Sequence, residues 1–174
     1  MHDIDGSKVY RLFYPSVPVI MAARFEGKVS AMPVVSVMSV SNSPPRICFS
    51  SSPLHRTYEA IVRSKSFSAS WLDRKFVKSV EKLGTSSATA ADKLSSAGLS
   101  HHGGKFLDVP VLDSASAVLE CSVMEVRALG DHDLVVGEVR GAYAEGDFDD
   151  YWAFSEYHPI LYAGMADRFR VYGC

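Results

Sequence analysis

The sequence has few cysteines and no long apolar run, and both shortages limit the class of protein. Its 174 residues contain three cysteines, at positions 48, 121 and 174, without a CxxC pair. A disulfide framework or a cysteine zinc site is therefore poorly supported, and we expect reduced thiols. No uninterrupted apolar run reaches about 18 residues, the length that a membrane span needs, and the polar N-terminus lacks the apolar core of a signal peptide. We expect a cytoplasmic protein without a membrane partner.

The chain also lacks an excess of charge of either sign. It carries 18 Lys and Arg against 20 Asp and Glu, a formal net charge of −2. Because no global basic surface is available for phosphates, we expect no nucleic acid partner. Walker A and GxGxxG sequences are absent as well, which excludes those phosphate-loop designs. Hydrophobic residues make up 47% of the chain, so we expect residues 1–174 to form a single domain with a substantial core.

Most of the apolar pattern predicts β-strands. Residues 17–26 and 29–41 are apolar runs separated at Gly27, which predicts a hairpin. Pro33 lacks an N–H group, so the second run is expected to be an edge, bulged or irregular strand. Further strands are expected at residues 46–51, 67–72, 116–129, 132–146 and 159–173. Consecutive strands of this kind predict a mainly β fold, an antiparallel barrel with short inserted helices.

Helical spacing occurs between these strands. Thr57 is the expected N-cap of a short helix, and Asp73 is the expected cap of a second one that ends at Gly84. A third helix is predicted over residues 88–97, with Ser86 or Ser87 as its cap and Gly98 as its stop. The glycines and prolines of residues 98–113 predict a long loop.

One corner of the sequence is rich in groups that hold anions. Ser50, Ser51 and Ser52 precede Arg56 and Thr57 at the predicted N-terminus of the first inserted helix. Hydroxyl donors, a guanidinium and the unpaired N–H groups of a helix start are the parts of a phosphate cradle. The alternative is an ordinary connection from strand to helix, with Thr57 as a cap and Arg56 in solvent.

Histidines offer two weaker candidates. His132 lies at the mouth of the hairpin predicted around Gly130, where it could move a proton or orient a ligand; the alternative is a surface turn residue. His101 and His102 are adjacent, and neighbouring histidines rarely both reach one ion, so we expect no metal site there. The acidic run at 145–152 is interpreted as a solvated turn.

Taken together, these segments resemble a family in their order and spacing. The most telling pieces are VSNSPPRI at residues 40–47 and GDHDLVVGEV at residues 130–139. They are similar to the flavin reductase-like FMN-binding split barrels, which include flavoredoxins and NAD(P)H:flavin or ferric reductases. The resemblance runs from about Tyr14 to Tyr172.

The resemblance implies roles for residues at matching positions. The irregular strand would lie along the flavin ring and contact it largely through its backbone. The serine-rich corner would hold the ribityl phosphate, Lys93 of the DKL motif would approach the flavin, and Tyr162 would close the pocket. His132 would lie near the ring and the nicotinamide as the catalytic residue. The cofactor-binding set is Ser30, Ala31, Met32, Pro33, Val34, Val35, Ser36, Ser50, Ser51, Ser52, Arg56, Thr57, Lys93, His132 and Tyr162.

Two departures from the family pattern concern the ring. Ser30 stands where many relatives carry Asn, and its hydroxyl has less reach than an amide. Met32 replaces a smaller residue and would alter the packing of the ring. Neither change excludes FMN.

The function implied by the resemblance is that of an FMN-binding oxidoreductase. NADH or NADPH would reduce the flavin, and the electrons would pass to free flavin, a ferric chelate, oxygen or a protein. The family also implies a homodimer, with which the aromatic residues of 151–162 are consistent. Two alternatives stay open: an electron carrier without a nicotinamide site, and a split barrel that binds another ligand such as haem.

Overall fold

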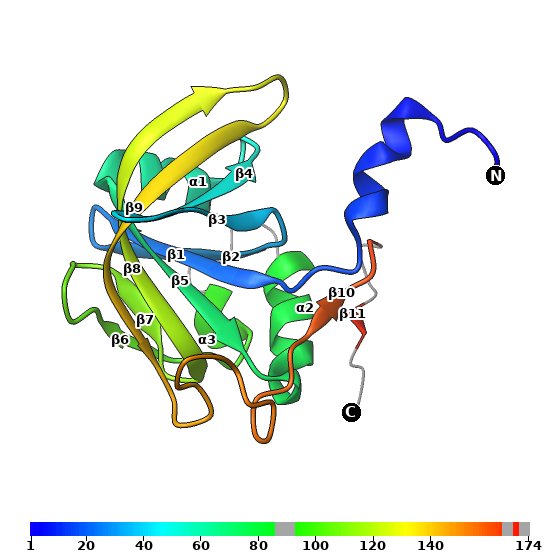
Figure 1. Cartoon of the computed structure of the whole chain (residues 1–174). Coiled ribbons are helices and arrows are strands. Elements are labelled where there is room, and N and C mark those ends of the chain that lie inside the picture. Colours follow the sequence, from blue (N-terminus) through cyan, green and yellow to red (C-terminus); the bar gives the residue numbers. More distant parts are fainter. Residues whose placement is uncertain (86–92, 165–168, 171–174) are drawn as a thin grey trace.

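The fold is built on one large curved antiparallel sheet, with short helices and two small two-stranded sheets around it (Figure 1). The computed structural model describes residues 1–85, 93–164 and 169–170. Seven strands follow the order β2-β1-β5-β8-β9-β4-β3 across the sheet. Their bounds are β1 Val19–Phe25, β2 Lys28–Val34, β3 Val37–Asn42, β4 Pro45–Ser51, β5 Ser66–Leu72, β8 Ala115–Ala128 and β9 Asp133–Ala144. The predicted mainly β, antiparallel fold with inserted helices is confirmed.

The hairpin at Gly27 forms as predicted, but the run that follows it is not one strand. Gly27 has a φ of 73°, the left-handed backbone that glycine adopts readily, and β1 pairs with β2 across it. Residues 29–41 divide into β2 and β3, with Val35 and Ser36 in neither strand. β2 and β3 lie at opposite ends of the strand order, so Pro33 is on an edge strand, where its missing N–H is tolerated. The chain therefore crosses from one edge of the sheet to the other at Val35 and Ser36.

Helix α1, Arg56–Ser64, packs mainly against strand β1. It begins one residue before Thr57, the predicted cap. His55 is the N-cap and makes no side-chain capping bond, so the prediction that Thr57 caps the helix is wrong. Thr57 is buried in the first turn, and its hydroxyl bonds to that of Ser30 at 2.8 Å. A hydroxyl with a partner on β2 is directed away from the helix backbone, which explains why Thr57 does not act as the cap.

For the other helices, we compare the predicted N-terminal caps and the predicted C-terminal ends with the structure. The Asp73 carboxylate accepts the Lys75 N–H at 3.0 Å and starts η2, Arg74–Phe76, which continues into α2, Val77–Thr85. Gly84 lies inside α2 and does not end it, contrary to the prediction. Of the third predicted helix, α3 at Lys93–Ser96 is observed and Gly98 follows it with a φ of 73°. Residues 86–92, including both candidate caps, lie outside the described residues.

The predicted long loop at 98–113 is partly a small sheet. β6, His101–Gly103, pairs with β7, Pro110–Leu112. Between them, the backbone N–H groups of Lys105, Phe106 and Leu107 point to the carboxylate of Glu120, which is fully buried on β8. A buried carboxylate with several donors orders this segment, and the glycine and proline content gave no sign of it.

The N-terminal helix and the small β10–β11 sheet lie on the same side of the large sheet (Figure 1). A 3₁₀ helix, η1 at Gly6–Phe13, has no buried residue. It leads to Tyr14, whose ring packs edge-on against Tyr162 of β10, Leu161–Tyr162, at 5.0 Å. β10 pairs with β11, Phe169–Arg170; the rest of the predicted strand at 165–168 and 171–173, like Cys174, lies outside the described residues. Cys48 and Cys121 are free and buried, as expected.

Two glycines of the GDHDLVVGEV segment have clear physical reasons. Gly130 has a φ of 96° in the turn between β8 and β9, at the predicted junction. Gly137 lies beneath Phe67, and a Cβ built there would approach the Phe67 ring to 2.6 Å. Phe67 also contacts Phe49 in the main core, at 5.4 Å between ring centroids. The absence of a side chain at residue 137 therefore lets the core close across β9.

Within the described part of the chain, no helix has both the length and the apolar character required to cross a membrane.

Candidate functional site

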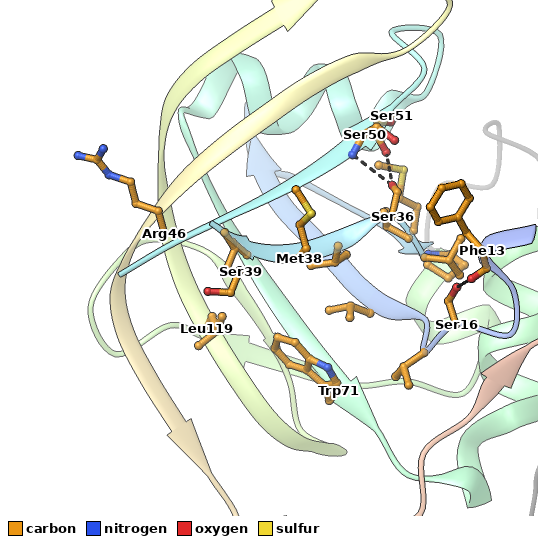
Figure 2. Close-up of a pocket in the computed structure, with 18 of the residues that line it drawn as sticks. Phe13, Ser16, Ser36, Met38, Ser39, Arg46, Ser50, Ser51, Trp71 and Leu119 are labelled. Carbon is orange, nitrogen blue, oxygen red and sulfur yellow. Dashed lines mark hydrogen bonds between the residues drawn. The ribbon is translucent and has the colours of Figure 1, made fainter. Parts of the chain in front are cut away.

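A groove of about 1570 Å³ opens beside the point where the chain crosses from β2 to β3. Figure 2 shows Ser36, Met38 and Ser39 on one side of it, and Trp71 and Leu119 on the strands opposite. It is lined by Tyr10, Phe13, Tyr14, Ser16, Val17, Val19, Met32, Pro33, Val34, Val35, Ser36, Val37, Met38, Ser39, Ser41, Asn42, Pro45, Arg46, Ile47, Ser50, Ser51, His55, Trp71, Leu119, Asp131, His132, Val139 and Ala142. The two edge strands of the large sheet, β2 and β3, thus both contribute residues to this groove.

The predicted flavin wall contributes its second half to this groove. Met32 to Ser36 line it, and Val35 and Ser36 belong to neither flanking strand. Ala31 is fully buried and packs in a separate core cluster, while the Ser30 hydroxyl bonds to Thr57. Ser30 and Ala31 therefore support the wall from behind.

The predicted phosphate cradle lies at one end of the groove. The Ser36 hydroxyl donates to the Ser50 carbonyl at 3.0 Å and accepts the Ser50 N–H at 3.1 Å, which ties the wall to the end of β4 (Figure 2). Ser51 also lines the groove, whereas Ser52 lies outside the lining and accepts the Leu54 N–H at 3.4 Å. Arg56 is exposed and has no partner within the described residues. Helix α1 starts here without a side-chain cap, so its first-turn N–H groups are available to an anion.

His55 is a cradle residue that the sequence interpretation missed. It lines the groove, and its Nδ1 lies 3.2 Å from the Ser51 hydroxyl. Partial burial lowers the pKa of its ring, and the positive charges of His132 and Lys93 lower it further. His132 and Lys93 are therefore close enough to act on the charge of His55. The available signal in the sequence was its position directly before the helix start.

His132 lies at the groove as predicted. Its Nδ1 is 3.1 Å from the Asp131 carboxylate, and the side chain is 48% exposed. The next residue, Asp133, accepts a hydrogen bond from the Tyr58 hydroxyl of α1. Burial raises the pKa of Tyr58 to about 12, and the Asp133 carboxylate adds to the shift. This bond holds the start of β9, and with it His132, against the helix that carries the cradle.

Lys93 and Tyr162 do not line the groove, and neither do Ser30, Ala31, Ser52, Arg56 and Thr57 of the predicted set. Lys93 on α3 is half-buried, and burial lowers the pKa of its ammonium group. Its positive charge nevertheless acts on the cradle, because it lowers the pKa of His55. Tyr162 packs against Tyr14, which does line the groove, so Tyr162 is one layer behind.

A metal centre is not formed by the residues that the structure describes, since no three His, Cys, Asp or Glu side chains gather there in a way that could hold an ion. His102 pairs with Asp113 at 2.6 Å, and the pair is exposed on the β6–β7 hairpin.

The residues in and beside the groove are chemically suited to both parts of FMN, the isoalloxazine ring and the ribityl phosphate. An isoalloxazine ring needs an apolar wall with nearby backbone groups, and Met32 to Val35 offer both. The ribityl phosphate needs hydrogen-bond donors and positive charge. Ser50, Ser51, His55 and the uncapped start of α1 offer donors at one end of the groove, and Arg56, the first residue of α1, lies beside them outside the lining.

Comparisons with known proteins agree with this geometry. The chain matches the flavin reductase like domain over residues 10–163. It is 33% identical to an uncharacterized protein of Aeropyrum pernix over 99% of this chain and 68% of that one. It is 30% identical to a flavin reductase of Pseudomonas putida, over 77% of this chain and 76% of the relative.

Solved structures show the same fold. An FMN-binding protein from Thermus thermophilus with bound 1-cyclohex-2-enone has a TM-score of 0.80 and 30% identity, covering 98% of this chain and 92% of that one. Flavoredoxin from Methanosarcina acetivorans has a TM-score of 0.85 and 23% identity, covering 100% and 92% of the two chains. These similarities confirm the expected split-barrel fold.

Proposed function

The chain belongs to the flavin reductase-like family, and we propose that it is an FMN-binding oxidoreductase whose flavin is reduced by NADH or NADPH. Family membership and the relatives support the coarser statement, a flavin-related oxidoreductase. The observation that carries the proposal is the combination of an apolar, backbone-rich wall with a hydroxyl-rich end, beside which α1 starts at Arg56 without a side-chain cap. FMN would supply the hydride and electron chemistry, and the protein would bind, orient and shield it.

The cradle would select the phosphate. Arg56 would place positive charge near the anion, and His55 would add a second charge only in acid, because its pKa is lowered by partial burial and by the positive charges of His132 and Lys93. Ser50, Ser51 and the first turn of α1 would donate hydrogen bonds to the phosphate oxygens. Thr57 would hold the helix start against Ser30 and contribute its backbone N–H. Lys93 would act through its charge at longer range.

His132 would serve the nicotinamide side. With Asp131 at its Nδ1, the ring can keep one orientation and present its other nitrogen to a ligand. We expect it to orient the donor and to stabilise the negative charge that develops as the hydride arrives.

We also propose that two copies associate. Met38 and Val40 of edge strand β3 are 60% and 46% exposed, and the edge backbone of a sheet is a common site of pairing. A second copy would cover these side chains and shield one rim of the groove. Light scattering is expected to give twice the mass of 19.0 kDa, and Met38→Lys with Val40→Lys to shift it to the monomer. A monomeric wild type would exclude the association.

The experiment that tests the function is an anaerobic titration followed by visible absorbance. FMN is added to the purified protein, the unbound flavin is removed, and NADH and then NADPH are added. Bound flavin that bleaches with either nucleotide supports the reductase and names its donor. Bound flavin that bleaches only with a donor protein would indicate an electron carrier, and an intense Soret band without flavin peaks would indicate a haem binder.

A further inference from the structure

A second source of positive charge lies along β4, away from the phosphate cradle. Arg46 is the one arginine or lysine among the described residues that line the groove. Its pairing strand β4 runs without a register shift against β9, so Arg46 and Ser50, at alternate positions of β4, face the same side. A strand rises about 3.3 Å per residue, which puts the two positions ~13 Å apart. In Figure 2, Arg46 lies at the left edge of the lining, well separated from Ser50 and Ser51.

The charge of Arg46 is only partly balanced by its neighbours. Glu138 of β9 lies opposite Arg46 in the sheet, and its Oε2 is 3.1 Å from the Arg46 Nη2. Its other oxygen, Oε1, is 2.7 Å from Nη1 of Arg140. One carboxylate therefore serves two guanidinium groups, and the three side chains together carry one formal positive charge. The side chains of Arg46 and Arg140 are 38% and 46% exposed, so both are accessible to a ligand at the rim of the groove.

This cluster also keeps hydrogen-bond donors that the protein does not use. Arg46 directs its Nε and Nη2 to Glu138, and the Arg140 Nε donates to the Ser122 hydroxyl at 3.2 Å. Nη1 of Arg46 and Nη2 of Arg140 have no acceptor within the described part of the chain. Ser41 of β3 lines the groove directly opposite Arg46, and its hydroxyl also has no partner among the residues that the structure describes. Guanidinium N–H groups beside a hydroxyl are suited to the oxygens of a phosphate.

The proposed position of FMN directs any further anion toward this cluster. With its phosphate beside Ser50 and Ser51, FMN would bring negative charge to the cradle, which repels a second phosphate from that end. A reducing nucleotide carries a pyrophosphate, and NADPH carries a further phosphate on its adenosine ribose. When the nicotinamide lies against the flavin, these phosphates need a counter-charge elsewhere along the groove, and Arg46 with Arg140 offers it.

We propose that Arg46 and Arg140 form a second anion site, which binds a phosphate group of the reducing nucleotide. The inference rests on the proposed function, because the nucleotide is the donor that reduces the flavin there. The contact would be made far from the hydride that is transferred, so it would bind the nucleotide equally in the ground state and in the transition state. Its loss is therefore expected to raise the KM for the nucleotide and to leave kcat nearly unchanged.

The test uses the FMN-loaded protein and two nucleotide fragments. Adenosine 2′-monophosphate carries the phosphate monoester that distinguishes NADPH, and ADP carries the pyrophosphate that NADH and NADPH share. Calorimetry measures the dissociation constant of each fragment. We expect Arg46→Gln to weaken the fragment that the site holds about fivefold or more, and the fragment affected identifies which phosphate it is. Glu138→Gln is expected to tighten the same fragment, because it removes the negative charge between the two guanidinium groups.

Arg63→Gln is the matched control, because Arg63 also pairs with a carboxylate, that of Glu59 at 3.2 Å, but lies outside the groove. It should leave both dissociation constants unchanged. Wild type that binds neither fragment, an Arg46→Gln variant that binds them as tightly as the control, or a Glu138→Gln variant that binds them no more tightly than wild type would overturn the second anion site. Bound FMN that still bleaches with a nucleotide would then leave the proposed function intact. Bound FMN that bleaches with neither nucleotide would overturn both.

Discussion

The buried carboxylate of Glu120 is expected to be one of the most costly side chains to neutralise in this protein. Its Oε1 accepts the Lys105 N–H at 2.7 Å and the Tyr143 hydroxyl at 3.1 Å. Its Oε2 accepts the N–H groups of Phe106 and Leu107 at 2.9 and 2.7 Å. Glu120→Gln places an NH₂ group at one of these oxygens, where it faces two donors. Two buried donors without acceptors correspond to a loss of about 2–4 kcal/mol of unfolding free energy.

The effect should depend on pH. Burial alone would raise the pKa of Glu120, but the backbone N–H groups and the Tyr143 hydroxyl outweigh it and hold the pKa below its usual 4.5. A carboxyl group with a lower pKa in the folded than in the unfolded state stabilises the fold above the unfolded pKa. That contribution is lost as the pH falls through the folded pKa. The difference between wild type and Glu120→Gln is therefore constant near neutral pH and narrows on acidification below about pH 4.5.

Urea denaturation followed by circular dichroism, at several pH values, measures these free energies. Glu125→Gln is the matched control, because it makes the same chemical change at an exposed position of the same strand. We expect the control to stay within about 0.5 kcal/mol of wild type. A Glu120→Gln variant as stable as the control, or a difference that does not narrow in acid, would refute the reasoning.

The other predictions concern the site and its support. His132→Ala should slow the bleaching of bound flavin by reduced nicotinamide while FMN stays bound; an unchanged rate would return His132 to a surface role. His55→Gln should weaken FMN binding more at pH 5 than at pH 8, because the lowered pKa of His55 leaves it charged only in acid, and riboflavin binding should show no such difference. Gly137→Ala should cost about 1–3 kcal/mol of unfolding free energy by forcing its Cβ against Phe67, whereas Gly146→Ala, with no atom within 4 Å of the added Cβ, should not; equal effects would contradict the packing argument.

Local signals in the sequence predicted much of the fold. Gly27 and Gly130 marked two turns because both need a positive φ, and Asp73 marked a helix start because its carboxylate accepts a backbone N–H. Features that depend on distant partners were missed. Thr57 looked like a cap until its hydroxyl was found bonded to Ser30, and the loop at 98–113 gained order from Glu120. The valine-rich run at residues 29–41 likewise gave no sign of the break at Val35 and Ser36. That break arises because β2 and β3 lie at opposite edges of the large sheet.

The site shows the same division between local and distant information. The corner at Ser50 and Ser51 could be recognised because a strand end, serines and a helix start are neighbours in sequence. The proximity of His55 to His132 and Lys93 could not, since these residues come from three separate elements.

The most direct test of the central claim, that the corner at α1 grips the FMN phosphate, is the ratio of the dissociation constants for riboflavin and FMN. It should be measured for wild type, for Arg56→Ala and for Arg63→Ala, which removes one positive charge from the other end of the same helix. The account predicts that wild type prefers FMN strongly, that Arg56→Ala loses about tenfold or more of this preference, and that Arg63→Ala keeps it. Equal affinities of the wild type for the two flavins, or equal losses in the two variants, would contradict it.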